Sequence, residues 1–152
     1  MAGMPSDDAD DQQRIVAALE QAAAGRRDRA LTDVLKMAAA SDRREFRLWQ
    51  HLAVTALNHP AGTSGISVFK PYRHVDIADA PPAVACTIRF LAAVAARDHD
   101  LLRTHYRAAK ATGTRLPVEV VGLLLDAATE ASTAVQEAAD RPDGTPGTGP
   151  GV

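Results

Sequence analysis

Apolar positions recur with helical spacing along most of the chain. One clear example has apolar side chains at positions i, i+3, i+4 and i+7: Leu31, Val34, Leu35 and Ala38. This spacing places side chains on one face of an α-helix. Similar patterns begin near residues 7, 42, 82, 99 and 117. We therefore predict an all-α fold, a single-domain bundle of about six helices over residues 6–140.

Polar residues and glycines predict where these helices begin and end. Ser6, Ser41 and Asp98 stand just before apolar periodic segments. Their side-chain oxygens can accept hydrogen bonds from the free N–H groups of a first helical turn. Gly25 and Gly113 follow such segments, and glycine is favoured just after a helix end.

The fourth helix carries two adjacent apolar stripes. Their members are Val84, Ile88, Leu91 and Ala95 on one, and Cys86, Phe90 and Ala93 on the other. Two stripes predict a helix covered on much of its circumference, at the centre of the bundle. We expect Asp79 or Ala80 to cap this helix, Pro81 and Pro82 to lie in its first turn, and Pro117 to begin the sixth helix.

The segment 59–82, HPAGTSGISVFKPYRHVDIADAPP, interrupts the helical pattern with four prolines and two glycines. Pro71 inside an α-helix would cost about 3 kcal/mol. We therefore expect a long irregular loop between helices 3 and 4. Loops of this length without secondary structure are uncommon in compact domains unless they are functional or disordered.

This loop gathers the candidate binding residues, which combine aromatic rings with charged groups: Phe69, Lys70, Tyr72, Arg73, His74 and Asp76. The cations could hold an anionic group between aromatic walls, as in many ligand pockets. Alternatively, Phe69, Val75 and Ile77 anchor the loop to the bundle and leave the charges in water. The sequence leaves both interpretations open.

A basic patch is the second candidate site. It consists of Arg43, Arg44, Arg47 and His51 in the third helix. Residues spaced by four share a helix face, and this face points away from Phe46 and Trp49. An exposed arginine face opposite the core also serves solubility, and nearby carboxylates interrupt its charge. Phosphate or nucleic-acid binding stays an alternative.

The sequence gives little support for a metal site or for a nucleophilic cysteine. His74 and Asp76 have a His-x-Asp spacing used in some iron sites, but such a site also needs a distal histidine in the same pocket, which the motif alone does not supply. Cys86 shares an apolar stripe with Phe90, which predicts a small buried hydrophobe rather than a nucleophile. We predict no metal, no cofactor and no catalytic residue.

Composition narrows the classes of protein. The 152 residues are 46% hydrophobic and carry a formal net charge of -2, without the strong basic excess of a dedicated nucleic-acid binder. A single cysteine excludes an intramolecular disulfide, and the acidic start lacks the pattern of a signal peptide. No apolar run is long enough to span a membrane. We expect a cytoplasmic protein with a disordered tail at residues 141–152.

Three functions remain open. The leading hypothesis is a small cytoplasmic non-enzymatic interaction protein, an adaptor, regulator or accessory subunit. It would bind a protein partner or a second copy through loop 59–82 and adjacent helix faces. One alternative is a small helical enzyme or anionic-ligand binder with its site under this loop. Another is a nucleic-acid-associated subunit that uses the face of Arg43 and Arg47.

Overall fold

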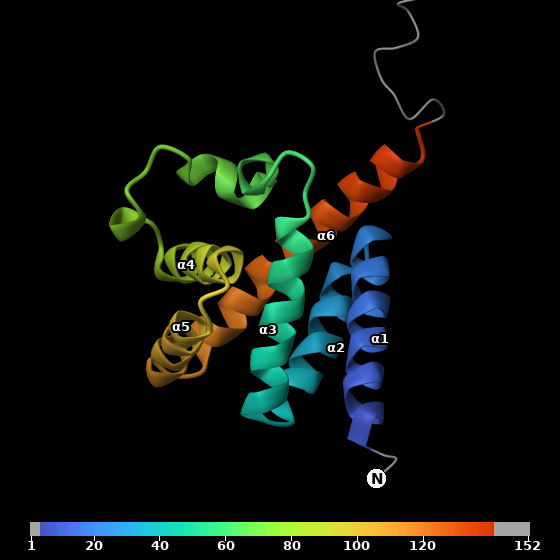
Figure 1. The fold of residues 1–152 in the computed structure, drawn as a ribbon, viewed down its shortest axis with the longest axis horizontal. Helices are drawn as coiled ribbons and strands as arrows, with labels where there is room; N and C mark the ends of the chain where they lie inside the picture. The colour runs from blue at the N-terminus through green and yellow to red at the C-terminus, as the bar shows by residue number, and fades with distance from the viewer. Residues whose placement is uncertain (1–3, 142–152) are drawn as a thin grey trace, which may run out of the picture.

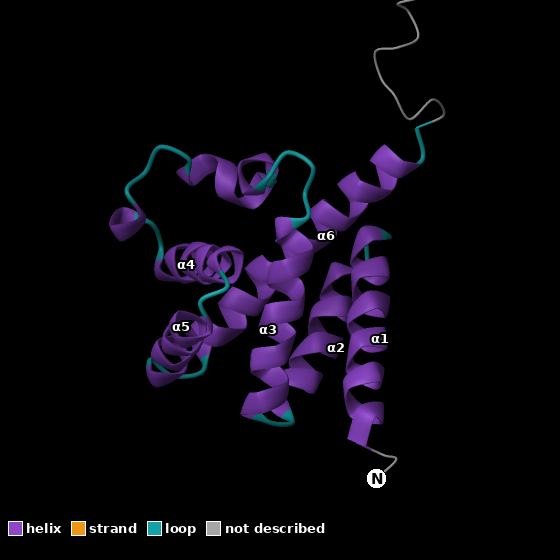
Figure 2. Ribbon diagram, in the orientation of Figure 1, coloured by secondary structure: helices purple, strands orange, loops and turns teal. Residues whose placement is uncertain are grey.

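The computed structural model describes residues 4–141, and their side chains from Asp8 onward. Within this range the chain forms α-helices and short 3-10 helices, with no strand (Figure 2). The α-helices are α1 (Met4–Ala23), α2 (Arg27–Ala39), α3 (Asp42–Leu57), α4 (Pro82–Ala96), α5 (His99–Ala111) and α6 (Arg115–Ala139). The prediction of an all-α single-domain bundle is confirmed. The tail predicted to be disordered lies outside the described residues except for Arg141.

Helix α6 is the centre of the bundle and packs against each of the other five α-helices. It runs diagonally behind α3 and α4 in Figure 1. Its fully buried residues are Val120, Val121, Leu124, Leu125, Ala127, Ala128 and Ala131. Small side chains on several sides of α6 allow neighbouring helices to approach closely. The prediction that the fourth helix lies at the centre was wrong, because α4 packs mainly on α3, α5 and α6, and its outer face lies beneath the segment 59–82.

Two of the predicted caps are confirmed. The Ser41 side chain accepts a hydrogen bond from the backbone N–H of Arg44 at the start of α3. Asp98 accepts one from the backbone N–H of Leu101 at the start of α5. Gly113 follows α5 with a φ of 125°, a conformation that a residue with a Cβ rarely adopts.

Three helix starts differ from the prediction. Helix α1 already begins at Met4, before the predicted cap Ser6. Pro81 occupies the cap position of α4, while Asp79, the predicted cap, is the last residue of a 3-10 helix two positions earlier. Helix α6 begins two residues before Pro117, which lies in its first turn. Proline is tolerated at any position of the first helical turn, because the backbone N–H groups of that turn have no partner within the helix.

The segment 59–82 connects α3 and α4 as predicted, but it is only partly irregular. It contains three 3-10 helices, η1 (Thr63–Gly65), η2 (Ser67–Tyr72) and η3 (Ile77–Asp79). Pro71 lies within η2, which confirms that no continuous α-helix forms here, while short 3-10 helices remain compatible with the prolines. The segment leaves the end of α3, arches over α4 and then joins the first residue of α4 (Figure 1).

Buried side chains and one carboxylate anchor this segment. Ile66 is fully buried and Phe69 is 7% exposed, both within the main hydrophobic core. The Glu130 carboxylate of α6 accepts hydrogen bonds from the Ser67 backbone N–H at 3.0 Å and from its hydroxyl at 3.1 Å. The expected anchor Val75 is instead 43% exposed. The anchoring interpretation therefore holds for Phe69, with Ile66 and Glu130 in place of Val75.

Replacing Glu130 by alanine is expected to release the start of η2. The variant loses the acceptor of the Ser67 N–H, so we expect amide hydrogen exchange to become faster over residues 66–73, with a loss of about 1 kcal/mol in unfolding free energy. Exchange measured by mass spectrometry checks this result. Glu137→Ala removes an exposed carboxylate near the end of the same helix and is the matched control. Equal exchange in both variants would show that Glu130 does not hold the segment.

No α-helix within the described range is long and apolar enough to cross a membrane. This observation agrees with the absence of a long apolar run from the sequence pattern.

Candidate functional site

A pocket of about 440 Å³ lies between the segment 59–82 and α4. Its volume is within the range of small-molecule sites, roughly 300–1,000 Å³. It is lined by Leu57, Thr63, Ser64, Phe69, Tyr72, Arg73, Val75, Ile77, Ala80, Ile88, Leu91, Ala92 and Ala95. The segment thus covers a cavity whose walls are mainly apolar.

The periodicities of two helices create this lining. On α4, the floor residues follow one another at i, i+3, i+4 and i+7: Ile88, Leu91, Ala92 and Ala95. On η2, Phe69 and Tyr72 are three residues apart, and residues with that spacing lie on the same side of a 3-10 helix. Aromatic side chains therefore face a floor that contains two alanines, and the small alanine side chains leave the space between them open.

Arg73 supplies the only charge in this lining. One of its terminal nitrogens donates a hydrogen bond to the Ser64 backbone carbonyl at 3.3 Å, which places the guanidinium beside η1. A guanidinium has five N–H donors in a fixed planar arrangement, so further donors remain for a ligand. Arg73 forms no ion pair with a carboxylate in the described part of the chain. Thr63, Ser64 and Tyr72 add hydroxyl groups to the same wall.

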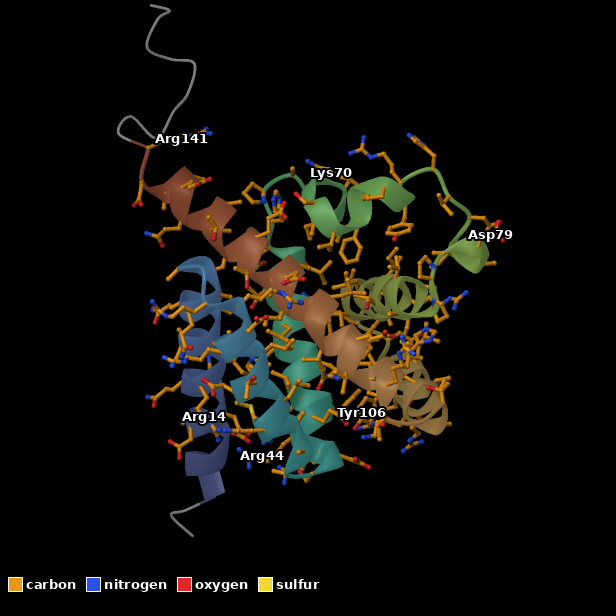
Figure 3. All side chains as sticks on the ribbon, turned by 180° about the vertical axis from the view of Figure 1, so that it is seen from behind. Arg14, Arg44, Lys70, Asp79, Tyr106 and Arg141 are labelled. Atoms are coloured by element: carbon orange, nitrogen blue, oxygen red, sulfur yellow. The ribbon has the colours of Figure 1, made fainter. Side chains whose placement is uncertain are left out.

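The structure brings together three of the six candidate loop residues. Phe69, Tyr72 and Arg73 all line the pocket. Lys70 is exposed and lies on the side of η2 that faces away from the helices (Figure 3). His74 is exposed outside the lining, and Asp76 accepts a hydrogen bond from the backbone N–H of Ala78 at the start of η3.

The α4 floor was missing from the sequence-based site. The stripe containing Ile88 and Leu91 was recognised as apolar but interpreted as a contact inside the bundle. Ala92 lies beside this stripe and is exposed. The stripe ends in small, exposed residues, and aromatic residues lie opposite them. This combination indicates a pocket rather than a packed interface.

The predicted basic patch does not form one exposed face. Asp11 of α1, whose side chain is only 4% exposed, accepts hydrogen bonds from Arg44 Nε at 3.0 Å and Arg47 Nη2 at 3.1 Å. Arg47 also pairs with Asp8. Helix α1 therefore covers two of the four cations, because its carboxylates pack against them. Arg43 is exposed and His51 is half-buried.

The Asp11 carboxylate is stabilised in its charged form. Its pKa is lowered from the ordinary value of 3.8, first by the hydrogen bond from Arg44 and then by Arg47, against the opposing effect of burial. Figure 3 shows Arg44 on the side of α3 that faces α1. This cluster joins two helices and contains no free cation for a ligand.

Cys86 does not have the properties of a nucleophile. Burial raises the pKa of its thiol, and nearby Arg89 only partly opposes that effect. The side chain is half-buried rather than fully buried as the apolar stripe predicted. Among the residues whose placement is described, no group of three His, Cys, Asp or Glu side chains could hold a metal ion.

Comparison with protein-family models, curated proteins and solved structures finds no match for this chain. The site is therefore interpreted from its own geometry.

Proposed function

We propose that this chain is a non-enzymatic binding protein. Its pocket beneath the segment 59–82 takes a small, mainly apolar molecule that carries one anionic group. The observation that supports this proposal is the combination of a mainly apolar cavity with one guanidinium, that of Arg73, in its wall. Apolar burial contributes affinity, roughly 25 cal/mol for each Å² removed from water, and the guanidinium selects the charge and orientation of the ligand.

The lining favours binding over catalysis. Tyr72 and Arg73 are its only titratable side chains in the described part of the chain. General acid–base or nucleophilic catalysis requires a base placed within hydrogen-bond reach of a nucleophile or substrate proton. Neither of these two residues pairs with such a group. The anchoring of the segment by Ile66 and Glu130 favours a pre-formed pocket, which lowers the entropic cost of binding.

A protein partner is the second candidate ligand. Val75 lines the pocket and is 43% exposed, and the charged side chains of Lys70 and His74 are exposed in the same segment. A partner could place one apolar side chain in the pocket and cover this surface. Such a complex would fill the cavity with one side chain, while most of its contacts would lie on the surface around the cavity.

Two related dyes test the proposed ligand class. Anilinonaphthalene sulfonate carries an apolar body and an anion, while phenylnaphthylamine has the same body without the anion. We expect Arg73→Gln to weaken the sulfonate dye about fivefold, the effect of one partly exposed charge-assisted contact, and to leave the neutral dye unchanged. Fluorescence titration measures both affinities.

Two further variants make the experiment specific. Lys70→Gln removes a neighbouring cation that does not line the pocket, so both dyes should bind it as they bind the wild type. Ala92→Phe places a ring in the cavity from an exposed helix position, so both dyes should bind more weakly. Failure of Ala92→Phe to affect either dye would overturn the pocket, and equal effects of Arg73→Gln and Lys70→Gln would overturn the role of Arg73.

A further inference from the structure

A second hollow lies between the first turn of α3 and one face of α5. Its volume is about 470 Å³. It is lined by Asp42, Arg43, Phe46, Arg103, Tyr106, Arg107, Lys110 and Ala111. We call this hollow the α3–α5 groove. Its chemistry differs from that of the pocket under the segment, because four of its eight lining residues are cations.

Two helices bring the cations of this groove together. Arg103, Arg107 and Lys110 follow one another at i, i+4 and i+7 on α5, a spacing that places them on one helix face. Arg43 joins them from α3. The three arginines form no ion pair with a carboxylate in the described part of the chain. Their donors are therefore available, in a chain whose formal net charge is -2.

A buried network fixes the fourth cation. Glu45, 7% exposed, accepts hydrogen bonds at 2.7 Å from both the Tyr106 hydroxyl and Lys110 Nζ. The hydrogen bond to Glu45 raises the pKa of Lys110, so the ammonium stays charged. Burial, with a further effect of Glu45, raises the pKa of Tyr106, so its hydroxyl stays protonated and remains a donor. Asp42, with a side chain 80% exposed, is the other carboxylate near Lys110.

Aromatic rings complete the groove. Phe46 is half-buried and its ring centre lies 5.2 Å from that of Tyr106. Both side chains belong to the lining. Figure 3 shows Tyr106 where α5 meets α3. Four cations and one carboxylate, Asp42, thus line the groove beside two aromatic rings, an arrangement that can contact a ring while it binds an anion.

We propose that the α3–α5 groove binds a phosphate ester of a ring compound, the class to which nucleoside monophosphates belong. Arg103 and Arg107 donate to the phosphate oxygens, Arg43 adds a third guanidinium, and Phe46 contacts the ring. Several guanidinium groups favour phosphate, which carries about two charges and three acceptor oxygens near neutral pH, over a carboxylate.

A small ligand fits this groove better than a long polyanion. The four cations all belong to one hollow of about 470 Å³, a volume that suits a single small anion and its ring. The groove uses the first turn of α3 and the other pocket uses its last residue, Leu57. At 1.5 Å per residue, the two sites lie on the order of 20 Å apart.

Titration with phosphate compounds tests this site. The probes are phenyl phosphate and a nucleoside monophosphate, each with its phosphate-free counterpart, phenol or the nucleoside. Amide chemical shifts in NMR spectra locate and quantify binding. We expect the phosphate compounds to shift residues of α5 and the first turn of α3, and the double variant Arg103→Gln/Arg107→Gln to weaken their binding at least tenfold. Added salt should weaken it as well, because the arginines are exposed.

The control is a double variant with the same loss of charge. Arg14→Gln/Arg29→Gln removes two exposed arginines from α1 and α2, so it should bind the probes as the wild type does. Equal weakening in both double variants would overturn the proposal, because binding would then follow net charge alone. Tighter binding of the phosphate-free compounds, or a single-stranded oligonucleotide that binds far more tightly than its monomer, would overturn the proposed ligand class.

Discussion

Replacing Trp49 by alanine is expected to lower the free energy of unfolding by about 4 kcal/mol, in the range measured for removal of large aromatic side chains from cores. Trp49 is fully buried in α3. Its ring lies 5.3 Å from that of Phe90 and 5.1 Å from that of Tyr106, both in edge-to-face geometry. The substitution therefore leaves a cavity where three helices meet, and urea unfolding followed by circular dichroism measures the loss.

The variant Trp49→Phe separates the contribution of ring packing to stability from that of the indole N–H group. The indole N–H of Trp49 is buried and has no hydrogen-bond partner in the described part of the chain. Phenylalanine keeps most of the contact with Phe90 and removes this unpaired donor, whose burial is unfavourable. We expect a loss of only about 1 kcal/mol, because relief of the unpaired donor offsets part of the lost volume. A loss as large as that of alanine would contradict this expectation, because the lost volume would then outweigh any relief of the unpaired donor.

Local patterns predicted the helices because their causes lie within a few residues. Ser41 caps α3 through a backbone N–H three residues away, and Asp98 does the same for α5. The burial of Trp49 also follows from its place on an apolar face. The centre of the bundle could not be predicted in this way. Both α4 and α6 are strongly apolar, and only the packing of all helices shows that α6 contacts each of the others.

Only part of the candidate pocket could be predicted, because sequence patterns show only residues that are close together along the chain. Phe69, Tyr72 and Arg73 were recognised because they stand close together in an unusual segment. Ile66 and Ala92 were missed, because the first anchors the segment in a distant core and the second is exposed on another helix. Contacts between residues far apart in the sequence leave no local pattern.

The ion pairs of the structure differ most from what the sequence pattern predicts. Asp11 and Arg44 are 33 positions apart, so each was interpreted separately, one as part of an acidic helix start and the other as part of a basic patch. In the structure they form one cluster between α1 and α3. The cations that do converge on a groove come mainly from α5, where the sequence pattern predicts no site at Arg103 and Arg107.

Replacing Asp11 by asparagine is expected to lower the free energy of unfolding at neutral pH by about 2–3 kcal/mol. Removal of one partner from a buried ion pair commonly costs 3–5 kcal/mol. The value should be smaller here because Arg44 and Arg47 are 29% and 21% exposed and regain some hydration. Asp10→Asn, which neutralises an exposed neighbour on α1, is the control and should change stability by less than about 0.5 kcal/mol.

The effect of Asp11 should depend on pH in a defined direction. Its pKa in the folded protein lies below the ordinary 3.8, so the folded state binds this proton less readily than the unfolded state does. The stabilisation is complete above 3.8 and disappears as the pH falls through the folded-state pKa. Urea unfolding of wild type and Asp11→Asn should therefore differ most near neutral pH and converge in acid. A difference that stays constant down to the most acidic measurable pH would show that the contribution of Asp11 comes from packing, because the paired charge would then have no part in it.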